Sequence, residues 1–273
     1  MAMFSYEFMI RALIASCFMA VIAPMLGVFL VLRRQSLLAD TLSHVSLAGV
    51  ALGFFLNQNP TVMTLIVVVI SALLLEYLRG LYKSYSEVST AILMAGGLSI
   101  ALVLMNANKG AAAMNIQQYL FGSIVTINWS QVRLLGILTA VSIILFLALK
   151  RPMYVLTFDE ETAHVDGLPT RLLSTMFNVL TGVAIAVMIP ISGALLVSAI
   201  MILPAAIAMK IGKSFNGVIF ISVGAGLLGM VSGLVASFQI DTPPGATITL
   251  IFIALFLLVN VFNVVMLRLL KKR

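Results

Sequence analysis

Long apolar runs alternate with short polar connections along the whole chain. Nine of them approach the roughly 20 residues that a helix needs to cross a bilayer, and they lie at about 12–32, 37–56, 61–78, 88–106, 132–149, 172–189, 191–209, 215–237 and 247–267. This pattern predicts an all-α, polytopic membrane protein with about nine transmembrane helices.

The boundary between the sixth and seventh runs is the least defined, because little more than Pro190 separates them. The region 172–209 fits two interpretations, a tight helical hairpin or a broken, partly re-entrant helix.

Composition places the chain firmly in the membrane class. Hydrophobic residues make up 62% of it and charged residues only 9%, against about 25% charged residues in soluble domains. No polar block is long enough to fold separately, so we expect a single transmembrane domain over 1–273. The net charge of +7 comes from short loops and indicates membrane topology and not nucleic-acid binding. Cys17, the only cysteine, excludes a disulfide or a thiolate cluster within the chain.

The distribution of Lys and Arg predicts the orientation. If the loop 33–36 is cytoplasmic, alternation places 13 of the 16 basic residues inside and only Arg11, Lys109 and Arg133 outside. The positive-inside rule therefore predicts an external N-terminus and a cytoplasmic C-terminus.

Asp40 and His44 stand one turn apart in the second apolar run. Such a pair lies on one helix face, about 6 Å apart along the axis, and its side chains suit a divalent transition metal. In the alternative interpretation, Asp40 caps the helix or pairs with Arg33 or Arg34, and His44 bonds to a carbonyl group. Two ligands are too few for a tight site, whereas two chains would supply an Asp2His2 set. Gly49 and Gly53, on the opposite face, predict close packing of another helix.

The internal connection at about 150–171 contains most of the acidic residues. Thr157 and Glu160 have the spacing of a capping box, and Gly167 followed by Pro169 predicts the end of a short helix over about 157–167. A solvated connection is the alternative. His164 is expected to be exposed and not to bind a metal.

Other polar residues have simpler interpretations. Glu76 is expected to pair with Arg79 three residues later. Asp241 is either a solvated loop acid or part of an outer gate or docking surface. Lys213 and Ser214 end a sequence like that of a phosphate-binding loop, but Ile207 replaces its leading glycine. The chain is thus predicted not to hydrolyse ATP.

The segment 33–53 reads Arg-Arg-x-Ser-Leu-x-x-Asp-x-Leu-Ser-His-x-x-Leu-Ala-Gly-Val-Ala-Leu-Gly. It resembles the signature of the permease subunits of zinc and manganese ABC importers, the ZnuB- and AdcB-like proteins. Further matches occur at 158–169, 193–197, 203–206 and 243–246, so the resemblance covers nearly the whole chain in order.

The resemblance implies a homodimeric pore in a bacterial cell membrane, cytoplasmic ABC ATPases and an external metal-binding protein. It implies that Asp40 and His44 contact the ion in transit, and that no cofactor is permanently bound. It also implies that the short helix docks into the ATPase, with the family motif formed by Phe158, Asp159, Glu160, Glu161, Ala163 and Gly167.

The metal is expected to be zinc, because manganese-type members more often have Leu-Pro-Gly where this chain has Leu47-Ala48-Gly49. Three alternatives stay open: a manganese permease of the same type, a self-contained proton-coupled metal carrier with Asp40 as the proton site, and a non-transporting scaffold subunit.

Overall fold

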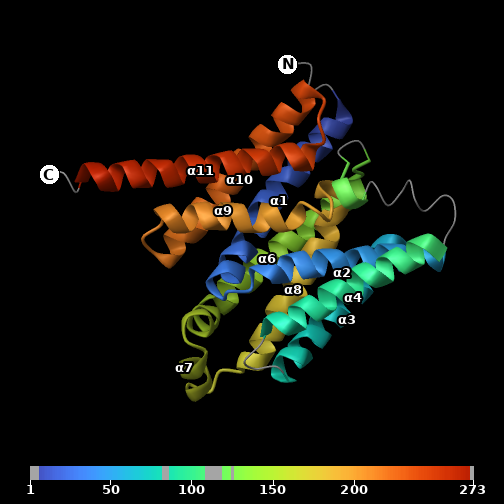
Figure 1. Cartoon of the computed structure of the whole chain (residues 1–273), viewed down its shortest axis with the longest axis horizontal. Coiled ribbons are helices and arrows are strands. Elements are labelled where there is room, and N and C mark those ends of the chain that lie inside the picture. The colour runs from blue at the N-terminus through green and yellow to red at the C-terminus, as the bar shows by residue number, and fades with distance from the viewer. Residues whose placement is uncertain (1–5, 82–85, 108–118, 124–125, 271–273) are drawn as a thin grey trace.

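Nine of the helices in the computed structural model correspond to the nine apolar runs, and a tenth is short and polar (Figure 1). The structure describes residues 6–81, 86–107, 119–123 and 126–270. Over these residues the helices are α1 (Glu7–Leu32), α2 (Ser36–Phe55), α3 (Pro60–Leu81), α4 (Ser86–Ala107), α6 (Trp129–Phe158), α7 (Glu160–Val165), α8 (Thr170–Ser192), α9 (Val197–Ile211), α10 (Phe215–Ile240) and α11 (Pro244–Leu270).

Eight of the described helices are long and apolar enough to span a membrane, and Val197–Ile211 is a shorter apolar helix. The prediction of an all-α, multi-pass membrane protein with about nine helices is confirmed. The basic residues Lys83, Lys109, Lys271, Lys272 and Arg273, which entered the orientation argument, lie outside the described residues.

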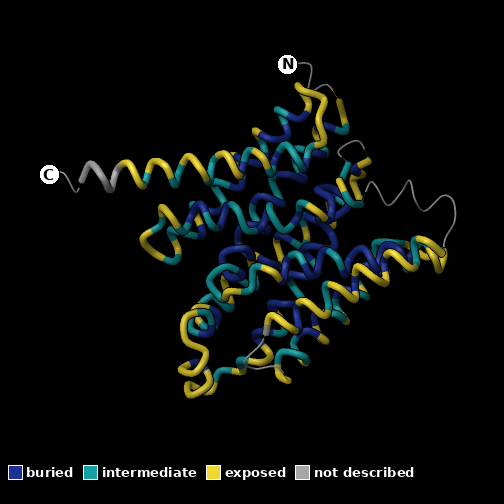
Figure 2. Tube along the Cα trace, viewed as in Figure 1, coloured by how far each residue is buried: buried dark blue, intermediate teal, exposed yellow. Residues whose placement is uncertain are grey.

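The helices form two groups that share a buried centre. In one group α2 packs between α3 and α4, and α3 packs on α8; in the other α1 packs on α9 and α10, and α11 on α10. The helices α1, α2 and α8 are mostly buried, whereas α3, α4, α6 and especially α11 are largely exposed (Figure 2). Apolar side chains exposed on these outer helices suit contact with lipid.

Glycines allow α2 to approach its neighbours closely, as the pattern predicted. A Cβ atom at Gly49 would lie 2.5 Å from the Thr64 Cα atom of α3, and one at Gly53 would lie 2.7 Å from the Pro60 Cα atom. On the opposite side of α2, a Cβ atom at Gly97 of α4 would likewise lie too close to the Cα atom of Val45. The helix with Asp40 and His44 is thus held firmly from two sides.

The break between the sixth and seventh runs is not at Pro190. This proline lies inside α8, which continues to Ser192, and the chain turns at Gly193 with a φ of +86°. A tight hairpin is wrong, because α9 packs mainly on α1, α10 and α11 and makes few contacts with α8. The 15 residues of α9 extend about 22 Å, which is less than the hydrocarbon thickness of about 30 Å.

Two distant turns meet at this break. The Ala194 N–H group donates to the Tyr119 carbonyl oxygen over 2.8 Å, and the Leu195 N–H group to Leu120 over 3.3 Å. Gly122 and Gly193 both have positive φ, and a Cβ atom at Gly193 would lie 2.5 Å from the Leu120 oxygen. The start of α9 is therefore fixed by backbone contact with another loop.

Candidate functional site

Asp40 is the fifth residue of α2, and His44 follows one turn later. The His44 Nε2 atom lies 3.8 Å from the Asp40 Oδ2 atom, and the two side chains are 17% and 37% exposed, respectively. Two ligands about 2.1 Å from a tetrahedral zinc ion are about 3.4 Å apart. The pair is therefore close to the spacing that joint coordination of one ion requires.

The third polar group at this position is Ser198, in the first turn of α9. Its hydroxyl donates to the Asp40 Oδ1 atom over 3.4 Å. Sequence reasoning did not select Ser198, because the contact depends on where the broken helix resumes. A signal was nevertheless available, since Ser198 follows directly on the family motif at 193–197.

Neither local alternative for the pair is observed. Asp40 lies inside α2 and not at its cap, and its only ion pair within the described segments is with His44. Arg33 instead donates from Nη2 to the Ser174 hydroxyl over 2.9 Å. The His44 Nδ1 atom is buried and has no hydrogen-bond partner among the described residues, so packing alone orients the ring.

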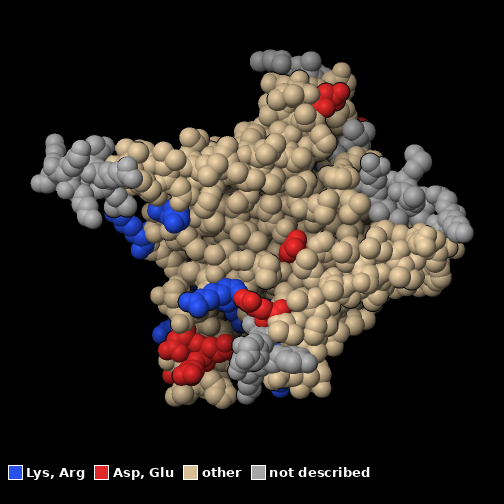
Figure 3. Space-filling model, viewed as in Figure 1, with Lys and Arg blue, Asp and Glu red and all other residues tan. Residues whose placement is uncertain are grey.

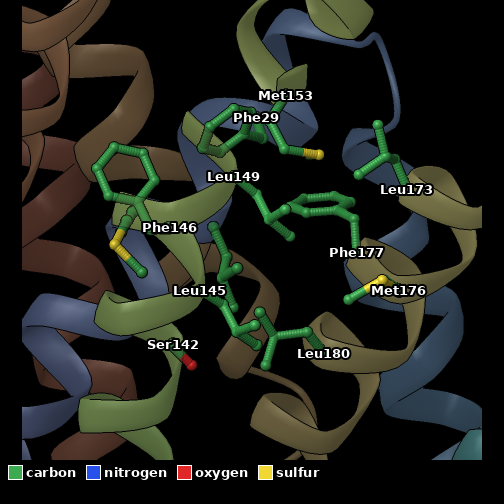
Figure 4. Close-up of a pocket in the computed structure, with 12 residues that line it drawn as sticks. Phe29, Ser142, Leu145, Phe146, Leu149, Met153, Leu173, Met176, Phe177 and Leu180 are labelled. Carbon is green, nitrogen blue, oxygen red and sulfur yellow. The ribbon is translucent and has the colours of Figure 1, made fainter. Parts of the chain in front are cut away.

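One chain supplies an incomplete ligand set. Over the described ranges, no group of three or more His, Cys, Asp or Glu side chains is placed to hold a metal ion. The cavity drawn in Figure 4 does not change this. It measures about 50 Å³, lies between α1, α6 and α8, and is lined by apolar side chains and Ser142. It offers no carboxylate or imidazole group.

The short polar helix was predicted correctly at its end but not at its start. Thr157 belongs to α6 and donates to the Met153 carbonyl group over 2.6 Å. The cap of α7 is Asp159, whose Oδ1 atom accepts the Thr162 N–H group over 2.9 Å. The helix contains six residues and ends before Gly167, whose φ is +76°.

The family-motif residues of the α7 segment differ in burial. Ala163 is completely buried and anchors the helix, whereas Phe158 is 57% exposed. Glu160, Glu161 and His164 are exposed, as was expected for His164. Acidic side chains gather over α7 with basic side chains beside them (Figure 3). Hydrogen bonds from the Thr162 hydroxyl and N–H groups lower the pKa of Asp159 below its usual value.

A buried polar network lies between α7 and the start of α2. The Glu76 Oε2 atom of α3 accepts from the Asn178 Nδ2 atom over 2.8 Å and from the Ser174 hydroxyl over 3.3 Å. The Ser174 hydroxyl in turn accepts from Arg33. Among the described residues Glu76 forms no ion pair with Arg79 within 4 Å, so the predicted local pair is wrong and α8 provides the partners.

Arg33 also interacts with α7 through its charge. Burial lowers the pKa of Arg33, and the carboxylates of Glu160 and Glu76 oppose this effect. Arg34 is exposed and has a φ of +56°, so the two adjacent arginines have different environments. Hydrogen bonds thus connect α3 and α8 with Arg33 at the end of α1, and Glu160 of α7 acts on Arg33 through its charge.

Asp241 lies at the end of α10, apart from the Asp40–His44 pair and from the hydrogen-bonded network of Glu76, Ser174 and Arg33. It is exposed, adopts a left-handed backbone conformation, and its carboxylate makes no hydrogen bond or ion pair to other residues in the described ranges.

Known proteins resemble this chain over nearly its whole length. The model of the ABC 3 transport family matches residues 5–263. A probable metal transport system membrane protein of Treponema pallidum is 31% identical and covers 94% of this chain and 96% of its own. The zinc uptake membrane protein ZnuB of Haemophilus influenzae is 26% identical, with 93% and 97% covered. The manganese transport membrane protein MntC of Halalkalibacterium halodurans is 25% identical, with 95% and 88% covered.

A solved structure gives the same result for the fold. PsaBC from Streptococcus pneumoniae, solved in complex with Fab, includes a chain that superposes with a TM-score of 0.83 and 25% identity, over 94% of this chain and 92% of that one. The chain therefore belongs to the ABC 3 transport family, as a multi-pass membrane permease of the metal-importing ABC transporters.

Proposed function

We propose that this permease imports zinc and that Asp40 and His44 bind the ion during its passage. The observation that carries the proposal is the acid–imidazole pair with its 3.8 Å spacing, partly exposed on a helix that has no other acidic or basic residue. A charged group is costly in a membrane helix unless it has a partner or a function. The hydroxyl of Ser198 adds one further oxygen.

The complete site forms between two copies of the chain. Zinc prefers four ligands, and each copy contributes one carboxylate and one imidazole. The exposure of both side chains supports this arrangement, because a buried pair would be inaccessible to a second copy. A site shared between copies also opens when they separate, which suits an ion that must leave as well as enter.

The energy comes from a separate cytoplasmic ATPase that docks on α7 and the adjoining residues 158–167. The exposed Phe158 and the acidic first turn of α7 supply the docking surface. Closure of the ATPases moves α7, and the Glu160–Arg33 interaction and the Glu76–Ser174–Arg33 bonds carry this movement to the start of α2. Docking of a cytoplasmic ATPase on α7 requires α7 to be on the cytoplasmic side, so the N-terminus is outside and the C-terminus is in the cytoplasm. An external metal-binding protein delivers the ion.

Manganese is the second candidate, because MntC is a relative of nearly the same identity as ZnuB. Asp and His ligands suit both metals, and zinc is preferred for the Leu47-Ala48-Gly49 sequence. Membership of an ABC transport family argues against a self-contained proton-coupled carrier.

The test is uptake of labelled zinc and labelled manganese by liposomes that contain the permease, its ATPase and its binding protein. We expect His44→Ala to reduce ATP-dependent zinc uptake by roughly tenfold or more, since even indirect metal partners contribute about 10–100-fold. Ile70→Ala, an exposed change on the neighbouring helix α3, is the matched control and should retain uptake.

Two outcomes would change the proposal. Uptake of manganese with the same loss in His44→Ala would keep the site and replace the metal. Undiminished uptake in His44→Ala would mean that the ion takes another path. ATP hydrolysis by each reconstituted variant shows whether the complex still assembles.

A further inference from the structure

A basic groove lies between the distal end of α6 and the start of α10, away from Asp40 and next to Phe158, the residue before the cap of α7. Its main cavity measures about 450 Å³ and is lined by residues that include Lys150, Arg151, Tyr154 and Ser214. A second cavity of about 190 Å³ shares Ser214 and adds Lys213. We call these two cavities together the α6–α10 groove.

The charges in the groove favour an anion. Lys150, Arg151 and Lys213 line it, no acidic residue does, and none of the three cations has an ion-pair partner within 4 Å in the part of the chain that the structure describes. The first N–H groups of α10, at Phe215 and Asn216, precede its first intrahelical hydrogen bond. They add the partial positive charge of a helix start to that of the side chains.

The groove lies at the depth of lipid headgroups. The apolar run of α6, at about 132–149, extends about 26 Å along the helix, which is close to the hydrocarbon thickness of about 30 Å. Lys150 and Arg151 therefore mark the membrane edge on the side of α7. Toward the bilayer from the groove, α6 exposes Ile144 and Leu147 by 65% each, and α10 exposes Phe220 by 78%.

We propose that the α6–α10 groove binds an anionic phospholipid, with its phosphate between Lys150, Arg151 and Lys213 and its acyl chains along Ile144, Leu147 and Phe220. Basic pockets between transmembrane helices at a membrane edge have the chemistry that recognises such headgroups. The proposal depends on the membrane location of the chain and not on which metal it carries.

A bound lipid would also stabilise the base of α7. The ring of Tyr154, which lines the groove, lies 4.8 Å from the ring of Phe158 and 5.1 Å from that of Phe215. These rings connect the end of α6 with the start of α10. Occupation of the groove therefore links lipid composition to the segment that precedes α7.

The test is native mass spectrometry of the purified permease after equilibration with equal amounts of phosphatidylglycerol and phosphatidylcholine. We expect wild type to retain phosphatidylglycerol preferentially, and the double variant Lys150→Gln/Arg151→Gln to retain at least roughly tenfold less, because each juxtamembrane cation contributes about fivefold. The control is Arg171→Gln/Lys210→Gln, which removes two exposed cations elsewhere and should retain the lipid as wild type does.

Competition and a third variant identify the source of the phosphate. Excess inorganic phosphate or glycerol phosphate should not displace the lipid, because these ions lack acyl chains; displacement by either would overturn the assignment to a lipid. Phe220→Ser should reduce retention without removing any charge, and unchanged retention would likewise contradict the acyl-chain contact.

Equal retention in wild type and Lys150→Gln/Arg151→Gln would overturn the proposal, as would an equal loss in the control. The competing occupant is an acidic surface of the partner ATPase. Loss of ATPase binding by the double variant in lipid-free detergent would assign the groove to that partner and contradict the lipid proposal.

Discussion

The Asp40 carboxylate is kept in an apolar helix by a combination of exposure and weak polar contacts. Its neighbours are a histidine at 3.8 Å and a serine hydroxyl at 3.4 Å, and both distances are long for a strong polar contact. A charge with strong permanent partners would bind an arriving cation poorly. The weak contacts of Asp40 therefore fit a transient ligand better than a structural ion pair.

At the residue scale, helical spacing was sufficient to predict that Asp40 and His44 share one face, and the structure places them together. Ser198 could not be predicted in the same way. It is 158 residues away from Asp40, and its contact depends on a turn at Gly193 whose partner, Gly122, lies 71 residues earlier in the sequence.

Gly193→Ala should destabilise the protein by about 1–3 kcal/mol, because alanine disfavours a φ of +86° and its Cβ atom would meet backbone atoms at 2.5 Å. Gly96→Ala is the control, since it lies in α4 with no atom within 4 Å of the added carbon, and it should stabilise by about 0.5–1 kcal/mol. The free energy of unfolding in detergent measures both changes. Equal effects would contradict the importance of the Gly122–Gly193 contact.

At the element scale, most helices follow directly from the apolar pattern, while their ends depend on packing. The capping-box spacing predicted Thr157 as the cap, but the cap in the structure is Asp159. Ring contacts of Tyr154 and Phe158 with Phe215 extend α6 past Thr157, so the cap is formed by Asp159. Such contacts between distant elements cannot be read from local residue preferences.

The adjacent arginines before α2 provide a test of the polar network. Arg33→Gln removes a charge-assisted hydrogen bond to Ser174 and should cost about 1.5–3 kcal/mol in the free energy of unfolding. It should also lower the amount of metal transported per ATP hydrolysed, because the link from Glu160 to α2 is lost. Both quantities can be measured in the reconstituted transporter and by thermal unfolding.

Arg34→Gln is the matched control for this experiment. Arg34 is exposed, and its replacement should change stability by less than about 0.5 kcal/mol. If the two variants lose transport equally, the network does not carry the signal, and the charge of the loop alone explains the effect.

At the scale of the whole molecule, apolar composition and run lengths were enough to predict an all-α membrane fold. The division into a buried centre and exposed outer helices was less visible, because α11 and α1 are similarly apolar yet differ greatly in burial. In a membrane both lipid and protein interiors favour apolar side chains, so hydropathy does not tell them apart.

A shared site predicts that the α2 helices of two copies face each other. Leu37 is 57% exposed and lies three residues before Asp40 on the same side of α2. In a Cys17→Ala background, Leu37→Cys should form dimers with a short bis-maleimide reagent in membranes. Phe220→Cys, on the exposed side of α10, should not. Cross-linking at Phe220 alone would contradict a site completed across α2.

The packing of α1 has a consequence for how the protein is made. Its main partners are α9 and α10, and the Ser222 hydroxyl donates to the Pro24 carbonyl group across 198 residues. At about 5–20 residues per second, the ribosome needs about 10–40 s to deliver these partners. During this time α1 is in the bilayer without its packing partners, in contact with lipid or with the insertion machinery. α1 thus reaches its final environment only when α9 and α10 have been synthesised.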